Sequence, residues 1–287
     1  MPLVTTPDLV EYDLRIGDRA VTLLGGPGGW GECSPLAGYA SDPASCRRAA
    51  EEAARLGYPP AVRDVIPVNV LVDGAFSVAE IRAYPAVKVK VRDATDVALV
   101  AAVRDAVEPS TKVRVDANGA WDVDTAVHMI GMLARYDLEY VEQPVATLDD
   151  LARVRRRVNV PIAADECIRS VDDARRLRAL DAADVIVLKQ QPLGGVRAAL
   201  EVAEAAGVPA VVSSMMETSV GIAAGVALAA ALPELSYACG LATVSMLSGD
   251  VTSDPLVPVD GVLAVRAVEP DPELLARYAD RGQEASR

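Results

Sequence analysis

Residues 112–118 read KVRVDAN, residues 139–144 read EYVEQP and residues 162–166 read IAADE. Each run is short and β-rich, and each carries an acidic residue where the run gives way to a loop. Apolar runs of this length are typical of strands in a parallel sheet, because helices cover both faces of such a sheet. A helical pattern separates each run from the next, so these residues predict consecutive βαβ units.

The same unit repeats in both directions along the chain from about residue 65. The strand candidates are Pro67–Val72, Ala86–Val91, Lys112–Ala117, Glu139–Gln143, Ile162–Asp165, Val185–Lys189, Ala210–Ser213 and Tyr237–Gly240. The helical stretches between them are Ser77–Tyr84, Thr95–Val107, Asp122–Tyr136, Leu148–Val158, Val171–Leu180, Val196–Ala206 and Val220–Ala231. Eight such units at a spacing of about 25 residues predict an α/β fold of the (β/α)₈ TIM-barrel type.

The first 64 residues follow another pattern, which predicts a small α+β capping domain at 1–64 ahead of a barrel at 65–249. Two β-like runs, Val10–Ile16 and Arg19–Leu24, predict a hairpin, and Pro43–Leu56 predicts a helix. The glycine-rich run at 25–29 is either a lid over the barrel mouth or a plain connection. We expect the polar tail, about 250–287 with a short helix at Pro272–Ala279, to lie against the capping domain.

Composition excludes several classes of function. The net charge of −13 argues against nucleic acid and acidic membranes as partners. The most apolar run, Val220–Leu232, is shorter than the roughly 20 residues of a membrane span and predicts a buried helix. Met1–Arg15 shows no signal peptide. Four scattered cysteines without a CxxC pair indicate reduced thiols and a cytoplasmic protein.

Lysine is rare, and its positions therefore carry information. Of 28 basic residues only four are lysines, at 88, 90, 112 and 189. Arginine does not give up its proton in proteins, whereas lysine can be tuned into an acid or a base. Lys112 begins its strand and is expected to be structural. The single histidine, His128, lies in a helical stretch and is expected on the helix surface.

The chemistry of a barrel lies at the carboxyl ends of its strands. Asp116, Glu142 and Asp165 end three successive strand candidates and should converge there. Three carboxylates in one place repel one another unless a cation lies among them. Oxygen ligands without histidine or cysteine favour a hard ion, so we expect Mg²⁺, with Mn²⁺ as a substitute.

Lys88 and Lys90 are two residues apart in a strand and face the same way. Their mutual repulsion should lower the pKa of one of them and prepare a base. Lys189 ends the strand across the barrel mouth, so it should face Lys90 over the metal. Three of the four lysines are thus expected around one site.

These motifs together resemble the enolase superfamily, in its branch with lysines on strands two and six. The motifs are Lys-x-Lys at 88–90, Asp-x-Asn at 116–118, Glu-Gln-Pro at 142–144, Ala-Asp-Glu at 164–166, Lys189, and GWGECSP at 29–35 in the capping domain. Within the superfamily's muconate-lactonizing-enzyme-like subgroup, the chain resembles the compact actinobacterial type of the o-succinylbenzoate synthase family. The features that carry this closer resemblance are the short capping domain, PVNV at 67–70, SSMMETSVG at 213–221 and GLAT at 240–243.

The resemblance implies a Mg²⁺-dependent lyase that dehydrates 2-succinyl-6-hydroxy-2,4-cyclohexadiene-1-carboxylate to o-succinylbenzoate in menaquinone biosynthesis. Lys90 would remove the α-proton and then assist departure of the hydroxyl as water. Lys88 would keep Lys90 deprotonated, and Lys189 would stabilise the enediolate from the other face by a cation–π contact. Asn118 and three serines at a helix start with free amides, Ser213, Ser214 and Ser219, would bind the substrate.

Other functions remain open at this point. A racemase for N-succinyl amino acids or a muconate-type cycloisomerase would use the same lysines and metal. A Schiff-base aldolase through Lys189 and a non-catalytic binding protein are more distant alternatives. In each enzyme reading the partner is a small-molecule carboxylate. The sequence does not reveal the oligomeric state, and a monomer is the working expectation.

Overall fold

The computed structural model describes residues 9–37, 39 and 41–280. At the N-terminal side β1 (Val10–Ile16), β2 (Arg19–Gly26) and β3 (Gly29–Cys33) form an antiparallel sheet, here called the capping sheet. It packs on α1 (Pro43–Leu56), the capping helix. Asp42 begins α1 because its carboxylate accepts the amides of residues 44 and 45. The predicted hairpin and helix are confirmed. The strand β3 was missed, because two of its five residues are glycine, which is rare in strands.

The glycine-rich run at 25–29 is a hairpin connection, so the lid alternative is wrong. The Gly28 N–H donates to the Ala54 carbonyl at 2.8 Å. A Cβ atom on Gly28 would lie 2.2 Å from the Gly57 nitrogen, so the turn presses on the end of α1 and only glycine fits there. The turn is therefore fixed to the capping helix and is not free to cover the barrel.

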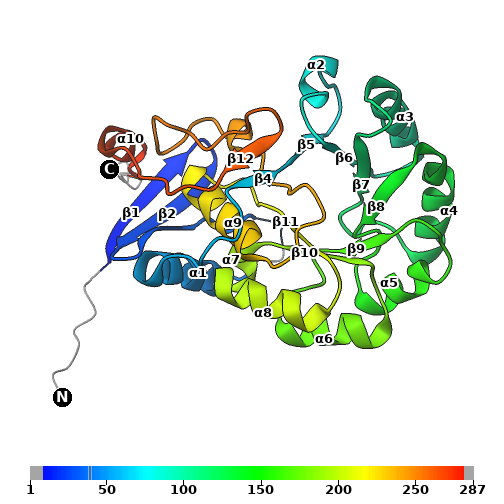
Figure 1. Cartoon of the computed structure of the whole chain (residues 1–287), viewed down its shortest axis with the longest axis horizontal. Coiled ribbons are helices and arrows are strands. Elements are labelled where there is room, and N and C mark those ends of the chain that lie inside the picture. Colours follow the sequence, from blue (N-terminus) through cyan, green and yellow to red (C-terminus); the bar gives the residue numbers. More distant parts are fainter. Residues whose placement is uncertain (1–8, 38, 40, 281–287) are drawn as a thin grey trace, which may run out of the picture.

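The barrel is a parallel sheet of seven strands in the order β11-β10-β9-β8-β7-β6-β5. The strands are β5 (Asn69–Val72), β6 (Ala86–Lys90), β7 (Lys112–Asp116), β8 (Leu138–Glu142), β9 (Ile162–Ala164), β10 (Val185–Leu188) and β11 (Ala210–Val212). Figure 1 shows the sheet curling between the capping sheet on one side and α3 to α6 on the other. The predicted α/β barrel fold is confirmed.

Helices follow the strands as the sequence predicts. They are α2 (Val78–Ile81), α3 (Val97–Ala106), α4 (Val123–Leu133), α5 (Leu148–Arg155), α6 (Val171–Leu180), α7 (Gln190–Leu193), α8 (Val196–Ala206) and α9 (Ser219–Ala231), with 3₁₀ turns at Ala94–Asp96, Ala134–Tyr136 and Val244–Met246. Thr147 and Ser170 cap α5 and α6 by accepting the backbone N–H of the residue three positions on. The short α7 was missed, since four residues carry no helical period.

The predicted eighth strand, Tyr237–Gly240, forms single bridges instead of a ladder. Cys239 bridges Val68 and Gly240 bridges Ser213, both in parallel. The Asn69 N–H donates to the Cys239 carbonyl at 2.9 Å, and the Gly240 N–H donates to the Val212 carbonyl at 2.8 Å. Cys239 therefore bonds to the edge formed by β5, and Gly240 bonds to the edge formed by β11. These two residues connect the first and last strands of the sheet.

The C-terminal segment lies against the capping sheet. β12 (Val262–Ala264) pairs antiparallel with β4 (Val65–Pro67), and α10 (Pro272–Tyr278) leads to a bridge between Ala279 and Leu14 of β1. In Figure 1 α10 stands beside β1, far from α3 to α6. The domain boundaries near 64 and 249 stay a prediction.

Helix α9 is the most buried helix of the fold. Every residue from Ser219 to Ala230 is buried, as expected for a helix that is apolar on all sides. In the described residues no helix is long and apolar enough to cross a membrane. The apolar run that the sequence singles out is therefore core, and it places the N-terminus of α9 at the barrel mouth beside the loop 213–218.

Candidate active site

Strand register brings the predicted charged residues into one row. Lys90 of β6 is the register partner of Asp116 of β7, and Asp116 is the partner of Glu142 of β8. Neighbours in a parallel register lie at the same height along the sheet. Asp165 follows the last residue of β9, and Lys189 follows the last residue of β10. The carboxyl ends of five successive strands thus supply the site.

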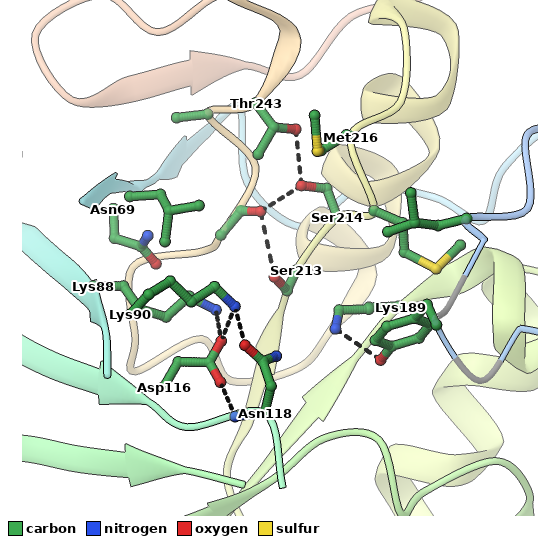
Figure 2. A pocket seen from close by; sticks show the side chains of 16 residues that line it. Asn69, Lys88, Lys90, Asp116, Asn118, Lys189, Ser213, Ser214, Met216 and Thr243 are labelled. Carbon is green, nitrogen blue, oxygen red and sulfur yellow. Dashed lines mark hydrogen bonds and ion pairs between the residues drawn. The ribbon is translucent and has the colours of Figure 1, made fainter. Parts of the chain in front are cut away.

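The carboxylates are buried and paired with the lysines. Lys88 Nζ lies 2.9 Å from Glu142 Oε1 and 3.4 Å from Asp116 Oδ2. Lys90 Nζ donates to Asp116 Oδ2 at 2.7 Å, and Lys189 Nζ donates to Asp165 Oδ2 at 2.5 Å. All three acidic residues are at most 3% exposed. Figure 2 shows Lys88 and Lys90 side by side, across the cavity from Lys189.

Repulsion from the neighbouring lysine does not set the pKa of Lys88. Burial opposes its charged form, but the charges of Glu142 and Asp116 outweigh burial and hold the pKa of Lys88 above its ordinary value. Lys189 behaves alike, since Asp165 and Glu166 overcome the cost of burial and raise its pKa. Carboxylates at bonding distance dominate over the neighbouring ammonium group.

The pKa values of Glu142 and Asp116 are shifted in opposite directions. Burial and the charge of Asp116 raise the pKa of Glu142 to about 8. The pKa of Asp116 is lowered, because Lys88 and Lys90 outweigh its burial. Carboxylates that shift each other in this way are close enough to repel, which is the condition under which a cation is retained.

No three His, Cys, Asp or Glu side chains of residues 9–37, 39 and 41–280 form a group ready to hold a metal ion. Asp116, Glu142 and Asp165 each turn toward a lysine instead. Their donor set still fits a hard divalent ion: it is all oxygen, it is buried, and Glu142 is crowded enough to need a compensating charge. Binding a metal there requires the lysines to release the carboxylates.

A cavity of about 180 Å³ opens beside these residues. It is lined by the three lysines, Asp116 and Asn118, by apolar residues of the capping loop and strand β5, and by the loops after β11 and Gly240; the full set is Leu36, Tyr39, Asn69, Leu71, Lys88, Lys90, Asp116, Asn118, Lys189, Ser213, Ser214, Met215, Met216, Gly240, Ala242 and Thr243. One part is cationic and the other is apolar with hydroxyls. Such a surface suits a small organic carboxylate.

Two of the three candidate serines reach the cavity and the third does not. Ser214 Oγ donates to the Gly240 carbonyl at 2.7 Å, and Ser213 lies beside it (Figure 2). Ser219 is fully buried, and its hydroxyl and N–H both bond to Asp250. The expectation of free amides at the start of α9 is wrong as well, because Glu32 takes the Gly221 N–H.

Asn118 lines the cavity and is tied to the lysines. Its side-chain oxygen accepts from Lys90 at 2.7 Å, and its nitrogen donates to Glu166 at 2.8 Å. Its backbone φ of 47° is left-handed, a conformation that asparagine tolerates better than most residues. Lys112 is exposed, and His128 is exposed on the surface of α4 as expected, so both lie away from the cavity.

Sequence reasoning missed Tyr39, which reaches the site from the capping domain. Its hydroxyl donates to Asp165 Oδ1 at 2.9 Å and accepts from Lys189 Nζ at 2.7 Å. The Lys189 ammonium lies 4.2 Å from the centre of the Tyr39 ring, a cation–π contact with the protein itself and not with the predicted enediolate. Nothing in the pattern around Tyr39 marks it, because it lies in a loop without periodicity.

Gln143 was also missed. It is fully buried with a left-handed φ of 39°, and its side-chain oxygen accepts the Asp165 N–H at 2.7 Å while its nitrogen donates to the Val145 carbonyl at 2.7 Å. The side chain therefore fixes the loop that presents Asp165. The thiol of Cys167 donates to the same oxygen, and burial raises its pKa to about 12, which leaves it unreactive.

Comparisons with known proteins identify the family and the fold. A family model described as "Enolase C-terminal domain-like" matches residues 71–271. The chain is 58% identical to an o-succinylbenzoate synthase of Thermobifida fusca, over 92% of this chain and 88% of that protein. It is 47% identical to an o-succinylbenzoate synthase of Mycolicibacterium smegmatis, over 94% and 89%. The crystal structure of muconate cycloisomerase from Pseudomonas fluorescens matches with a TM-score of 0.81 at 26% identity, over 95% of this chain and 97% of that one.

Proposed function

The chain belongs to the enolase C-terminal domain-like family, and from that premise we propose that it is an o-succinylbenzoate synthase, a carbon–oxygen lyase. The reaction removes water from 2-succinyl-6-hydroxy-2,4-cyclohexadiene-1-carboxylate and yields o-succinylbenzoate, a step of menaquinone biosynthesis. Relatives of that name at 58% and 47% identity over nearly the whole chain support the assignment.

The observation that carries the proposal is the pair of lysine faces on one cavity. Lys88 and Lys90 enter from β6, Lys189 enters from the end of β10, and the buried carboxylates lie between them. A dehydration that starts with loss of an α-proton needs a base, a proton donor for the leaving hydroxyl and positive charge near the carboxylate. This cavity offers all three.

Family membership implies a divalent metal, and we propose Mg²⁺, with Mn²⁺ as a substitute, held by Asp116, Glu142 and Asp165. When bound, the cation stabilises the negative charge that grows on the substrate carboxylate as the α-proton leaves. Asp116, Glu142 and Asp165 would hold the cation in place of their lysine partners, and Lys88, Lys90 and Lys189 would then be free to face the substrate.

The chain's own lysines then divide the proton transfer. Lys90, the most exposed of the three at 22% of its side chain, takes the α-proton and returns it to the departing hydroxyl, so that water leaves. Lys88 supports Lys90 in this role from the same strand and also contacts the substrate carboxylate. Lys189 stays protonated and stabilises the developing charge from the other side. Asn118, Ser213 and Ser214 orient the substrate.

A racemase for N-succinyl amino acids is a second candidate, because lysines on two sides of the cavity permit a proton to leave and return from opposite faces. A Schiff-base aldolase is disfavoured. Its lysine must be a neutral amine, whereas Lys189 is paired with Asp165 and its pKa is raised.

The substrate class is tested by supplying each candidate to the purified enzyme with Mg²⁺. We expect o-succinylbenzoate to form from the cyclohexadiene substrate with a kcat/KM at least about tenfold above that for racemisation of N-succinyl amino acids or for cycloisomerisation of muconate. A higher kcat/KM for either rival would overturn the assignment. Borohydride in the presence of substrate should trap no adduct on Lys189.

We further propose a cytoplasmic enzyme that acts as a monomer without nucleic-acid or membrane partners. Its four cysteines, Cys33, Cys46, Cys167 and Cys239, are free thiols, as is usual in a reducing compartment. Its net charge of −13 repels phosphate backbones. Sedimentation of the purified protein tests the oligomeric state.

A further inference from the structure

A second pair of buried carboxylates lies outside the catalytic row. Glu32, on β3 of the capping sheet, is 2% exposed, and Glu217, in the loop between β11 and α9, is 3% exposed. A Cβ atom added to Gly221 would lie 2.4 Å from the Glu217 Cβ and 2.9 Å from Glu32 Oε2, so one glycine separates the two side chains. Neither residue has a role in the proposed reaction.

Glu32 fastens the capping sheet to the start of α9. Its carboxylate accepts from Ser34 Oγ at 2.6 Å, from Thr218 Oγ1 at 2.5 Å and from the backbone N–H of Gly221 at 3.0 Å. The Thr218 N–H adds a longer bond at 3.3 Å. A carboxylate with this many donors is held rigidly. The helix is thereby capped by a residue from another part of the chain.

Glu217 holds the wall of the cavity. Its Oε2 accepts the Met215 N–H at 2.6 Å, and its Oε1 accepts from Gln191 Nε2 at 3.4 Å. Gln191 in turn donates to Ser34 Oγ at 3.1 Å and accepts the Ser34 N–H at 2.8 Å. A continuous hydrogen-bond network therefore runs from the capping sheet through α7, two residues after Lys189, to the cavity wall.

Met215 is held from its other side too. Arg19 of β2 is 8% exposed, and its guanidinium donates to the Ser34 carbonyl at 2.7 Å and to the Met215 carbonyl at 3.4 Å. Met216, the next residue, has a left-handed φ of 63°, which a side chain adopts only under constraint from its neighbours. The segment 213–216, which faces the substrate cavity, thus owes its shape to groups behind it.

We propose that Glu217, supported by Glu32, is a positioning residue that sets the wall formed by Ser213, Ser214, Met215 and Met216, and so determines how tightly the substrate is bound. The inference rests on the proposed function only in the identity of the substrate. It assigns to the capping sheet a part in substrate affinity that acts through hydrogen bonds and without contact with the substrate.

Both carboxyl groups of the pair are harder to ionise than a glutamic acid in water. Burial raises the pKa of Glu217 to about 7 and the charge of Glu32 adds to the effect, while burial raises the pKa of Glu32. Arg19 is the positive charge that faces Glu217, and the Cys46 thiol faces it from α1. As the pH rises through about 7, Glu217 gains a negative charge, and the wall should loosen.

The test compares Glu217→Ala, Glu217→Gln and the control Asp250→Asn, which weakens the cap of the same helix without touching the wall. Glu217→Ala should raise KM for the cyclohexadiene substrate about tenfold and lower kcat less than about threefold. Glu217→Gln still accepts the Met215 N–H, so its KM should stay within about threefold of wild type. In wild type KM should rise between about pH 6 and about pH 8.5, and in Glu217→Gln that rise should vanish.

A measurement without substrate separates this inference from the proposed function. Hydrogen exchange of a peptide covering 213–218 should be faster in Glu217→Ala than in wild type and unchanged in Asp250→Asn. Unchanged exchange and KM in Glu217→Ala would overturn the inference, as would a KM rise in Asp250→Asn equal to that in Glu217→Ala. A wild-type enzyme that does not turn over the substrate would refute the proposed function, while the exchange data would still decide the positioning role.

Discussion

The molecule buries two groups of carboxylates near one cavity, and the two groups are neutralised in different ways. Asp116, Glu142 and Asp165 lie on strand ends, and lysine ammonium groups contact all three. Glu32 and Glu217 lie behind the cavity wall, and hydroxyl and amide donors surround them. Charges that face lysines can exchange them for a metal and substrate, so the first group suits chemistry. Carboxylates held by several neutral donors keep a fixed geometry, so the second group suits positioning.

The largest effect should come from the first group. Lys90→Ala should lower kcat at least about a thousandfold, because the α-proton loses its base. Metal binding measured by calorimetry should persist, since Asp116, Glu142 and Asp165 remain. Lys112→Ala removes an exposed lysine at the other end of β7 and is the matched control, with unchanged turnover. Wild-type activity in Lys90→Ala would refute the assignment.

Glu217, in the second group, should change how the free energy of unfolding depends on pH. The folded-state pKa of Glu217, about 7, lies above its ordinary value of 4.5, so the folded protein retains a proton that the unfolded chain releases. Its contribution is present below pH 4.5 and is lost as the pH rises to about 7, by roughly 3 kcal/mol. Urea unfolding of wild type and Glu217→Gln across this window measures the difference. Parallel pH profiles for the two proteins would contradict the shift.

Tyr39 links the capping domain to the first group. Removing its hydroxyl should lower kcat less than removing the Lys90 side chain does. Tyr39→Phe keeps the ring over Lys189 but removes the bonds to Asp165 and Lys189. We expect kcat to fall about tenfold with little change in thermal stability. Steady-state kinetics measure the change in kcat, and a thermal melting curve of the same protein measures the change in stability. An equal loss in Tyr39→Phe and Tyr39→Ala would mean that the ring contributes nothing.

Ser219 should show the smallest effect on activity. Its hydroxyl bonds to Asp250 and accepts the Leu256 N–H at 2.7 Å. Ser219→Ala should reduce the free energy of unfolding by about 1–2 kcal/mol and leave kcat/KM unchanged. Denaturant titration and kinetics on one preparation suffice. A raised KM would return Ser219 to the substrate site.

The contrast also shows which features a sequence reveals. Strand ends have a period and a register, so Asp116, Glu142 and their lysine partners could be placed from the pattern of β6 to β10. The second group has no such pattern, because Glu32 and Glu217 are 185 residues apart and meet only when the capping sheet docks. Tyr39 escaped prediction for the same reason.

Two features that local sequence did not reveal have a common physical cause. Serine and glycine near a helix start suggest free amides, yet a buried helix end must be satisfied by some partner, and here Asp250 and Glu32 are the partners. Likewise, the pKa of Lys88 is decided by Glu142 and Asp116, which come from neighbouring strands and not from the sequence around Lys88. Local sequence shows which polar and ionisable groups are present. Their neighbours in the folded protein determine their hydrogen bonds and their pKa values.

We propose that the lysine–carboxylate row dehydrates the cyclohexadiene substrate with the help of a divalent ion. The most direct measurement is o-succinylbenzoate formation by the wild-type enzyme before chelation, after chelation and after Mg²⁺ is restored. We predict turnover, loss of at least about 99% of it with the chelator, and recovery with Mg²⁺. Undiminished turnover in the chelated enzyme, or none in the presence of Mg²⁺, would contradict the account.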